Sequence, residues 1–135
     1  MGTPIVSRSP LTALAVLLLM SIVSTSEQGG KPSSRVIRLV AERFVFTPSD
    51  ITVTEGTMVE IRITSEDTAH GFRLAGPEGI DVEIPKRGRG DVRVTFEAKA
   101  AGTYVFECSR LCGAGHDFMR GTIRVVPKAS ARTTE

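Results

Sequence analysis

Between Arg35 and Val126 apolar residues recur at every second position, and this period of two limits the fold more than any other feature. Such alternation is typical of strands that bury one face and expose the other. The clearest runs are Ile37–Ala41, Val59–Ile63, Val92–Phe96, Tyr104–Cys108 and Ile123–Val125. Turn-forming residues separate these runs, and no amphipathic helix of normal length fits between them. About seven or more short strands of this kind predict an all-β, antiparallel two-sheet sandwich.

Four ligand-type side chains gather within twelve residues near the C-terminus, namely Cys108, Cys112, His116 and Met119. This stretch contains both cysteines of the chain and one of its two histidines. Thiolate, thioether and imidazole donors together select copper over hard cations. Cys108 falls at the end of an expected strand, on its buried face, and the other three lie on the loop that follows. The sequence therefore predicts a metal site on this loop.

Other interpretations use the same residues. A Cys108–Cys112 disulfide would suit an exported protein, but its ring is very small and it leaves the other ligands without a role. Two cysteines and two histidines would satisfy zinc, although methionine is a poor zinc ligand. Cys112, His116 and Met119 with His70, the second histidine, match a mononuclear blue-copper set. Cys108 is then a spare thiolate, and two thiolates bridging two copper ions would give a dinuclear site.

Residues 1–26 have the layout of a targeting segment. Arg8 precedes the apolar run Leu11–Val23, and small residues follow as far as Ser26. The run is shorter than the roughly 20 residues of a membrane-spanning helix. We expect a signal peptide, with an uncleaved membrane anchor as the alternative, and hence a periplasmic protein or one on the outer face of the cytoplasmic membrane. Residues 27–34 are interpreted as a flexible linker, 35–128 as the folded domain and 129–135 as a disordered tail.

The charge balance excludes one class of partner. The chain has 17 Lys and Arg against 15 Asp and Glu, for a net charge of +2. A general nucleic-acid binder would show a concentrated basic face, so we expect no nucleic-acid partner. A hydrolase is also disfavoured, because no Ser/His/Asp constellation with a recognisable loop is present.

The motif Cys108-x3-Cys112-x3-His116-x2-Met119 resembles the CuA loop of cytochrome c oxidase subunit II, and nitrous oxide reductase carries a similar domain. The segment Thr64–Phe72 around the other histidine is similar to the segment that carries the first histidine ligand of that family. The likeness covers roughly residues 43–126 and is strongest to the short subunit II of B-type haem-copper oxidases.

This resemblance implies a cupredoxin-like Greek-key fold and a mixed-valence centre of two copper ions. Cys108 and Cys112 would bridge both ions, and His70 with Met119 would complete one of them. His116 and the backbone carbonyl of Arg110 would complete the other. The implied role is one-electron transfer from a cytochrome c or small cupredoxin toward haem in oxidase subunit I. The lone chain would be an electron-transfer module, and within an oxidase it would be the electron-entry subunit.

Two departures from the family pattern affect the expected partners. Arg110 stands where many members carry a glutamate that helps to bind magnesium, and the chain has no tryptophan for electron entry. Arg110 and Arg120 also place positive charge beside the loop, which favours a neutral or acidic donor. A copper-delivery protein and a disulfide-bonded adhesion sandwich are the alternatives from other functional classes.

Overall fold

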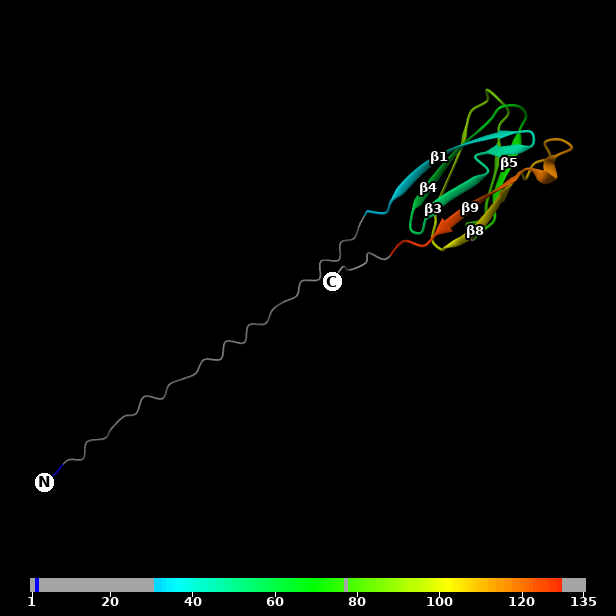
Figure 1. The fold of residues 1–135 in the computed structure, drawn as a ribbon. Coiled ribbons are helices and arrows are strands. Elements are labelled where there is room, and N and C mark those ends of the chain that lie inside the picture. Colours follow the sequence, from blue (N-terminus) through cyan, green and yellow to red (C-terminus); the bar gives the residue numbers. More distant parts are fainter. Residues whose placement is uncertain (1, 3–30, 77, 130–135) are drawn as a thin grey trace.

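In the part of the chain that the structure describes, nine strands form two sheets that face each other (Figure 1). The computed structural model describes residues 2, 31–76 and 78–129. One sheet has the order β2-β1-β4-β7, with bounds Val45–Thr47, Ser34–Glu42, Met58–Ser65 and Val92–Glu97. The other has the order β3-β9-β8-β5-β6, with bounds Asp50–Thr54, Arg120–Val126, Gly102–Glu107, His70–Leu74 and Ile80–Ile84. The predicted all-β two-sheet sandwich is confirmed.

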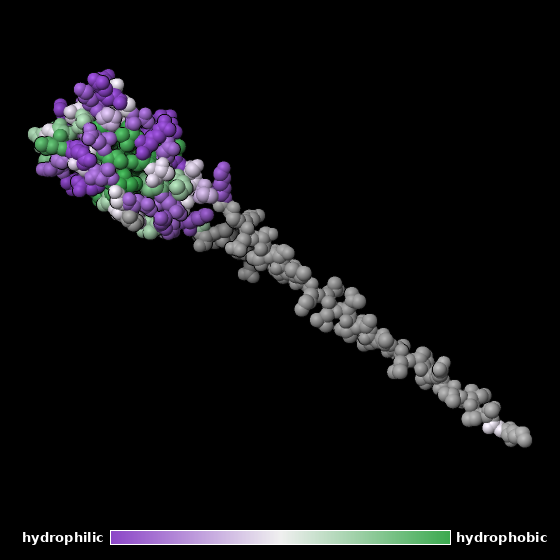
Figure 2. All heavy atoms as spheres, turned by 180° about the vertical axis from the view of Figure 1, so that it is seen from behind, coloured by the Kyte–Doolittle hydropathy of each residue, from purple (hydrophilic) through white to green (hydrophobic). Residues whose placement is uncertain are grey.

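The core lies between the sheets and is built from the inward positions of the alternating runs. In β4, for example, Val59, Ile61 and Ile63 are all fully buried, while the residues between them are partly exposed. At the centre, the Phe106 ring packs 5.3 Å from Phe46. The outward positions leave a mostly hydrophilic surface with an apolar area toward the middle of the face in Figure 2. Burial of one face of each strand therefore holds the two sheets together.

Two strand pairs differ from the antiparallel expectation. β1 pairs with β4 in parallel, and β3 pairs with β9 in parallel, whereas the other pairs are antiparallel. The chain leaves the first sheet after β2, forms β3 in the second sheet, and returns to the first as β4. Strands that become neighbours through such a crossing can run in the same direction, a relation that alternation within each strand does not specify.

The only helical element among the described residues is the short 3-10 turn η1, His116–Phe118. No helix in that part of the chain is long and apolar enough to span a bilayer. Apart from Gly2, the expected targeting segment 1–26 lies outside the described residues, as do 27–30 of the expected linker and 130–135 of the expected tail. Those expectations stay predictions.

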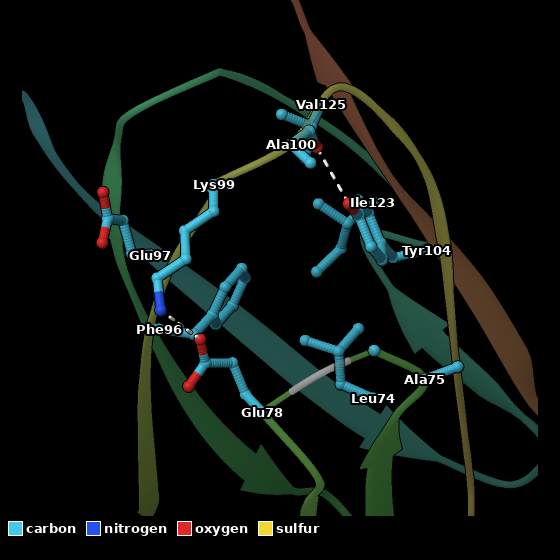
Figure 3. Close-up of a pocket in the computed structure, with 11 residues that line it drawn as sticks. Leu74, Ala75, Glu78, Phe96, Glu97, Lys99, Ala100, Tyr104, Ile123 and Val125 are labelled. Carbon is cyan, nitrogen blue, oxygen red and sulfur yellow. Dashed lines mark hydrogen bonds and ion pairs between the residues drawn. The ribbon is translucent and has the colours of Figure 1, made fainter.

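A small apolar pocket opens between the sheets (Figure 3). Leu74, Phe96 and Ile123 form part of its wall, and Tyr104 donates a hydrogen bond to the Ala100 carbonyl beside it at 2.9 Å. Leu74 ends β5, whereas the ligand candidate His70 begins that strand. The pocket therefore belongs to the end of the sandwich away from the predicted metal ligands.

Candidate metal centre

The loop between β8 and β9 carries most of the predicted ligands and is closed at its base by the backbone. The Cys108 amide donates to the Met119 carbonyl at 2.9 Å, so the first and last ligand candidates lie side by side. Within the loop, His116 begins η1 and its Nδ1 faces Cys112 Sγ. His70 begins β5, which pairs with β8. Adjacent strands of one sheet thus bring together residues that are distant in the sequence.

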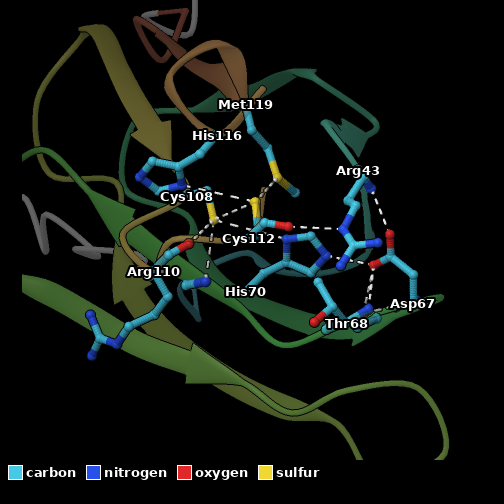
Figure 4. A network of polar contacts seen from close by, with 11 residues as sticks. Arg43, Asp67, Thr68, His70, Cys108, Arg110, Cys112, His116 and Met119 are labelled. Carbon is cyan, nitrogen blue, oxygen red and sulfur yellow. Dashed lines mark hydrogen bonds and ion pairs between the residues drawn. The ribbon is translucent and has the colours of Figure 1, made fainter. Parts of the chain in front are cut away.

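All five predicted side-chain donors meet at one place (Figure 4). Cys108 Sγ and Cys112 Sγ lie 3.7 Å apart. His70 Nδ1 is 3.9 Å from Cys108 Sγ, and His116 Nδ1 is 3.8 Å from Cys112 Sγ. Met119 Sδ is 3.9 Å from Cys112 Sγ. The donor atoms of His70 and the two cysteines all lie within 4.8 Å of one another, and His116 and Met119 join this group through Cys112.

The sixth predicted donor, the carbonyl oxygen of Arg110, lies 3.1 Å from Cys108 Sγ. The guanidinium of the same residue points away to the surface, where Nη1 is 3.3 Å from Asp81 Oδ1 (Figure 4). The carbonyl oxygen of Arg110 therefore faces the cysteine sulfur atoms, whereas its positively charged side chain does not.

Asp67 orients the His70 ring, which is fully buried. His70 Nε2 is 2.7 Å from Asp67 Oδ1, and the carboxylate also accepts the backbone N–H groups of Arg43 and Thr68. Burial alone would raise the pKa of Asp67, but hydrogen bonds from His70 and the two backbone groups outweigh it and lower the pKa to about 2. An ionised carboxylate only accepts hydrogen bonds, so Nε2 donates to Asp67 and Nδ1 is the ring nitrogen that faces the cysteines.

The two cysteines are free thiols and are almost completely buried, with 4% and 5% of their surface exposed. Burial, followed by the hydrogen bond with Cys108, raises the pKa of the Cys112 thiol to about 11. A metal bound here would have to displace that proton. The compact group of His70 with the two cysteines contains no carboxylate. Buried sulfur with imidazole nitrogen is a donor set that suits copper, so the residues present fit a copper ion.

Glycine is required where the chain approaches the loop most closely. The Gly71 amide donates to Cys108 Sγ at 3.4 Å, and a Cβ at Gly71 would lie 2.8 Å from the backbone nitrogens of Ser109 and Arg110. Gly113 has a φ of +143°, and a Cβ there would lie 2.9 Å from the Phe44 ring. These positions let β5 and the hairpin between β1 and β2 pack directly against the ligand loop.

The structure brings the predicted donors together, and sequence reasoning missed the residues that support them. Asp67 precedes His70 by three residues, and Arg43 donates from Nε to the Cys112 carbonyl at 2.8 Å. An Asp three residues before a candidate ligand histidine was a usable signal. Nothing in the sequence near Arg43 indicated its contact with a loop 69 residues away.

Comparisons with known proteins agree with this geometry. The model of the cupredoxin-like domain family matches residues 11–125. A cytochrome c oxidase subunit 2 from Thermus thermophilus is 37% identical over 94 residues, which cover 70% of this chain and 67% of the relative. A second sequence of that name from a strain of the same species is 37% identical and is covered over 54% of its length.

Solved structures show the same relationship. A haem-copper terminal oxidase dimer contains a chain with 27% identity and a TM-score of 0.61, covering 70% of this chain and 65% of that one. Auracyanin A, a blue copper protein from Chloroflexus aurantiacus, has 25% identity and a TM-score of 0.54, covering 70% of this chain and all of its own. The chain thus spans about two thirds or less of its oxidase relatives. It belongs to the cupredoxin-like domain family, in which it groups with cytochrome c oxidase subunit 2.

Proposed function

We propose that this chain is an electron-transfer domain with a dinuclear CuA centre. The observation that carries the proposal is the arrangement of two buried thiols 3.7 Å apart, each with its own imidazole. A mononuclear site needs only one thiolate, whereas two thiolates between two imidazoles suit a pair of ions.

Cys108 and Cys112 would bridge the two ions. His70 and Met119 would complete the ligands of one ion, and His116 with the Arg110 carbonyl would complete those of the other. When bound, the copper pair supplies one-electron redox chemistry, in which a donor is oxidised and an acceptor is reduced.

The protein would hold the ligand atoms in fixed positions and exclude water from them. Cys108, Cys112, Met119 and His70 are all buried, which excludes water from most of the site. Strand ends, the backbone bond at the base of the loop and the carboxylate of Asp67 restrict the movement of these groups. Preorganised ligands reduce the structural rearrangement that accompanies oxidation or reduction of the copper. A small rearrangement favours fast electron transfer.

The donor would approach at the ligand loop. Leu111 and Phe118 are large apolar residues of this loop with 85% and 81% of their surface exposed, and they stand next to the ligands Cys112 and Met119. We propose that these two side chains contact the partner protein, because apolar surface beside a redox site can be buried when a partner docks. Between them in the sequence, the half-buried His116 provides the ligand nearest to this surface. We propose a cytochrome c or a small cupredoxin as donor and haem of an oxidase subunit I as acceptor.

The charge of the donor is a further part of the proposal. The ion pair with Asp81 partly offsets the positive charge of Arg110. Arg120 donates to a neutral group, the backbone carbonyl of Asp117, and keeps its full charge. A neutral or acidic donor is therefore expected. Transfer rates measured against salt with donors of both charges check this, and faster transfer from a basic donor at low salt would contradict it.

The location follows from the proposed role and from the sequence of the N-terminal segment. We propose that residues 1–26 direct export or anchor the chain, that 27–34 connect them to a domain of residues 35–128, and that the copper site works outside the cytoplasm.

One observation favours a second candidate function. His70, Cys108 and Cys112 form a compact group that could hold a single ion, so a mononuclear copper carrier or a copper-delivery protein is the alternative.

The decisive experiment loads the purified chain with copper and measures the copper-to-protein ratio and the EPR spectrum. Two coppers that share one unpaired electron give hyperfine splitting from two equivalent nuclei. One copper per chain with single-nucleus splitting would refute the dinuclear centre.

A further inference from the structure

Arg43 contacts the candidate centre through both its backbone and its side chain. With Phe44 it forms the two-residue turn of the hairpin between β1 and β2, where Glu42 faces Val45. The Arg43 N–H donates to Asp67 Oδ2 at 3.0 Å, and its Nε donates to the Cys112 carbonyl at 2.8 Å (Figure 4). One residue of a distant hairpin thus contacts two separate parts of the site.

These two bonds act on two different predicted ligands. Asp67 uses its other oxygen to accept from His70 Nε2 at 2.7 Å, so the Arg43 backbone steadies the carboxylate that orients this ring. The bond from Nε holds the Cys112 backbone, whose sulfur lies 3.7 Å from that of Cys108. Movement of Arg43 would therefore shift a histidine from β5 and a cysteine from the loop at the same time.

The neighbouring Phe44 shows that this contact is tightly packed. Its ring lies where a Cβ on Gly113 or Gly115 would be, with a separation of 2.9 Å at Gly113 and less at Gly115. The hairpin tip is therefore seated against the ligand loop, and the bond from Arg43 Nε to Cys112 is partly buried. A hydrogen bond from a charged donor in such surroundings contributes more than one at an open surface.

Among the described residues, the guanidinium of Arg43 takes part in no ion pair with a carboxylate, since its bond to Asp67 comes from the backbone. A nearby cation stabilises whichever state of a redox centre carries less positive charge. In a copper site this is the reduced state, so the cation raises the reduction potential.

We propose that Arg43 is a positioning residue of the copper site, whose guanidinium fixes the Cys112 backbone and whose charge raises the reduction potential of the loaded centre. This inference rests on the proposed copper-binding function. It assigns a tuning role to a side chain that contributes no ligand atom.

Two substitutions separate the two effects. Arg43→Met removes both the charge and the donor, whereas Arg43→Lys keeps the charge but loses the planar donor at Nε. Arg38→Met is the matched control, because it removes an equal charge from the exposed face of β1, the strand that leads into the turn with Arg43. The backbone bond to Asp67 is available in all three variants.

With copper bound, Arg43→Met should have a lower reduction potential than the wild type, and Arg43→Lys should stay near the wild-type value. Both should bind copper about 10- to 100-fold more weakly, the usual effect of losing a group that orients a metal ligand. Arg38→Met should change neither quantity. Equal potentials for the wild type and Arg43→Met would overturn the electrostatic role.

The metal-free protein distinguishes failure of this inference from failure of the proposed function. Amide hydrogen exchange should be faster in Arg43→Met at the loop amides of His116 and Phe118, which bond within the loop at 3.1 Å. Unchanged exchange in both Arg43 variants would overturn the positioning role, whether or not the chain binds copper. If Arg43→Met does not fold, Arg43→Lys decides the matter through exchange and copper affinity. A wild type that takes up no copper would refute the proposed function alone.

Discussion

Gly71→Ala tests how closely β5 must approach the ligand loop. Gly71 does not have a positive φ, so alanine causes no backbone strain and the effect reports on the contact alone. The added Cβ would lie 2.8 Å from the backbone nitrogens of Ser109 and Arg110, compared with 3.4 Å at the short end of ordinary contacts. The strand and the loop would have to separate by roughly 0.6 Å, since neither backbone nitrogen can rotate away.

The size of the effect follows from that displacement. Overpacking of a closely packed site costs about 1–3 kcal/mol, so the metal-free variant should unfold at a lower denaturant concentration with an unchanged slope. A metal site tolerates shifts of only about 0.5 Å. Because the displaced segment carries the Arg110 carbonyl and follows Cys108, we expect copper affinity to fall and the EPR spectrum to change.

The assays are urea unfolding of the metal-free chain, followed by copper titration and EPR of the loaded one. Ser109→Gly is the control, because it removes a nearby hydroxyl but leaves both backbone nitrogens in place. The double variant Gly71→Ala with Ser109→Gly should regain little of the lost stability or copper affinity. A Gly71→Ala protein with wild-type stability, two coppers and an unchanged spectrum would show that the close approach of β5 does not constrain the site.

Three further substitutions test the proposed ligands and the docking surface. Cys108→Ala should leave a site for one copper, and a retained two-copper EPR signal would show that this residue is not a bridge. Arg110→Ala should keep the two-copper spectrum, since only its carbonyl is a proposed ligand; loss of one copper would contradict this. Phe118→Ser should slow electron transfer from a cytochrome c about 10- to 140-fold without altering the potential, because it removes an apolar contact of about 1.5–3 kcal/mol from the proposed docking surface. Stopped-flow kinetics at constant salt measures this rate. If Phe118→Ser transfers electrons as fast as the wild type, the donor docks elsewhere.

Most of the fold was predictable because alternation in a strand reports directly on burial. Ile37, Leu39 and Ala41 were expected to face inward, and each has less than a tenth of its surface exposed. The parallel pairs β1–β4 and β3–β9 were not predicted. Alternation says which face of a strand is buried, but not which strand lies beside it or in what direction.

The residues of the candidate site were also predictable only in part. Spacing and ligand chemistry brought out Cys108, Cys112, His116 and Met119, because these residues lie close together in the sequence. His70 was included because the chain has only one other histidine, and its Nδ1 does lie 3.9 Å from Cys108 Sγ.

The sequence alone determined the two-sheet architecture and the choice of candidate donor atoms, since both depend on local periodicity and side-chain chemistry. The tertiary structure decided what supports those atoms. Asp67 orients the ring of His70, and Arg43 reaches Cys112 from a hairpin 69 residues earlier. Such contacts depend on how strands and turns are placed in space, and long-range placement of this kind leaves no periodic signal in the chain.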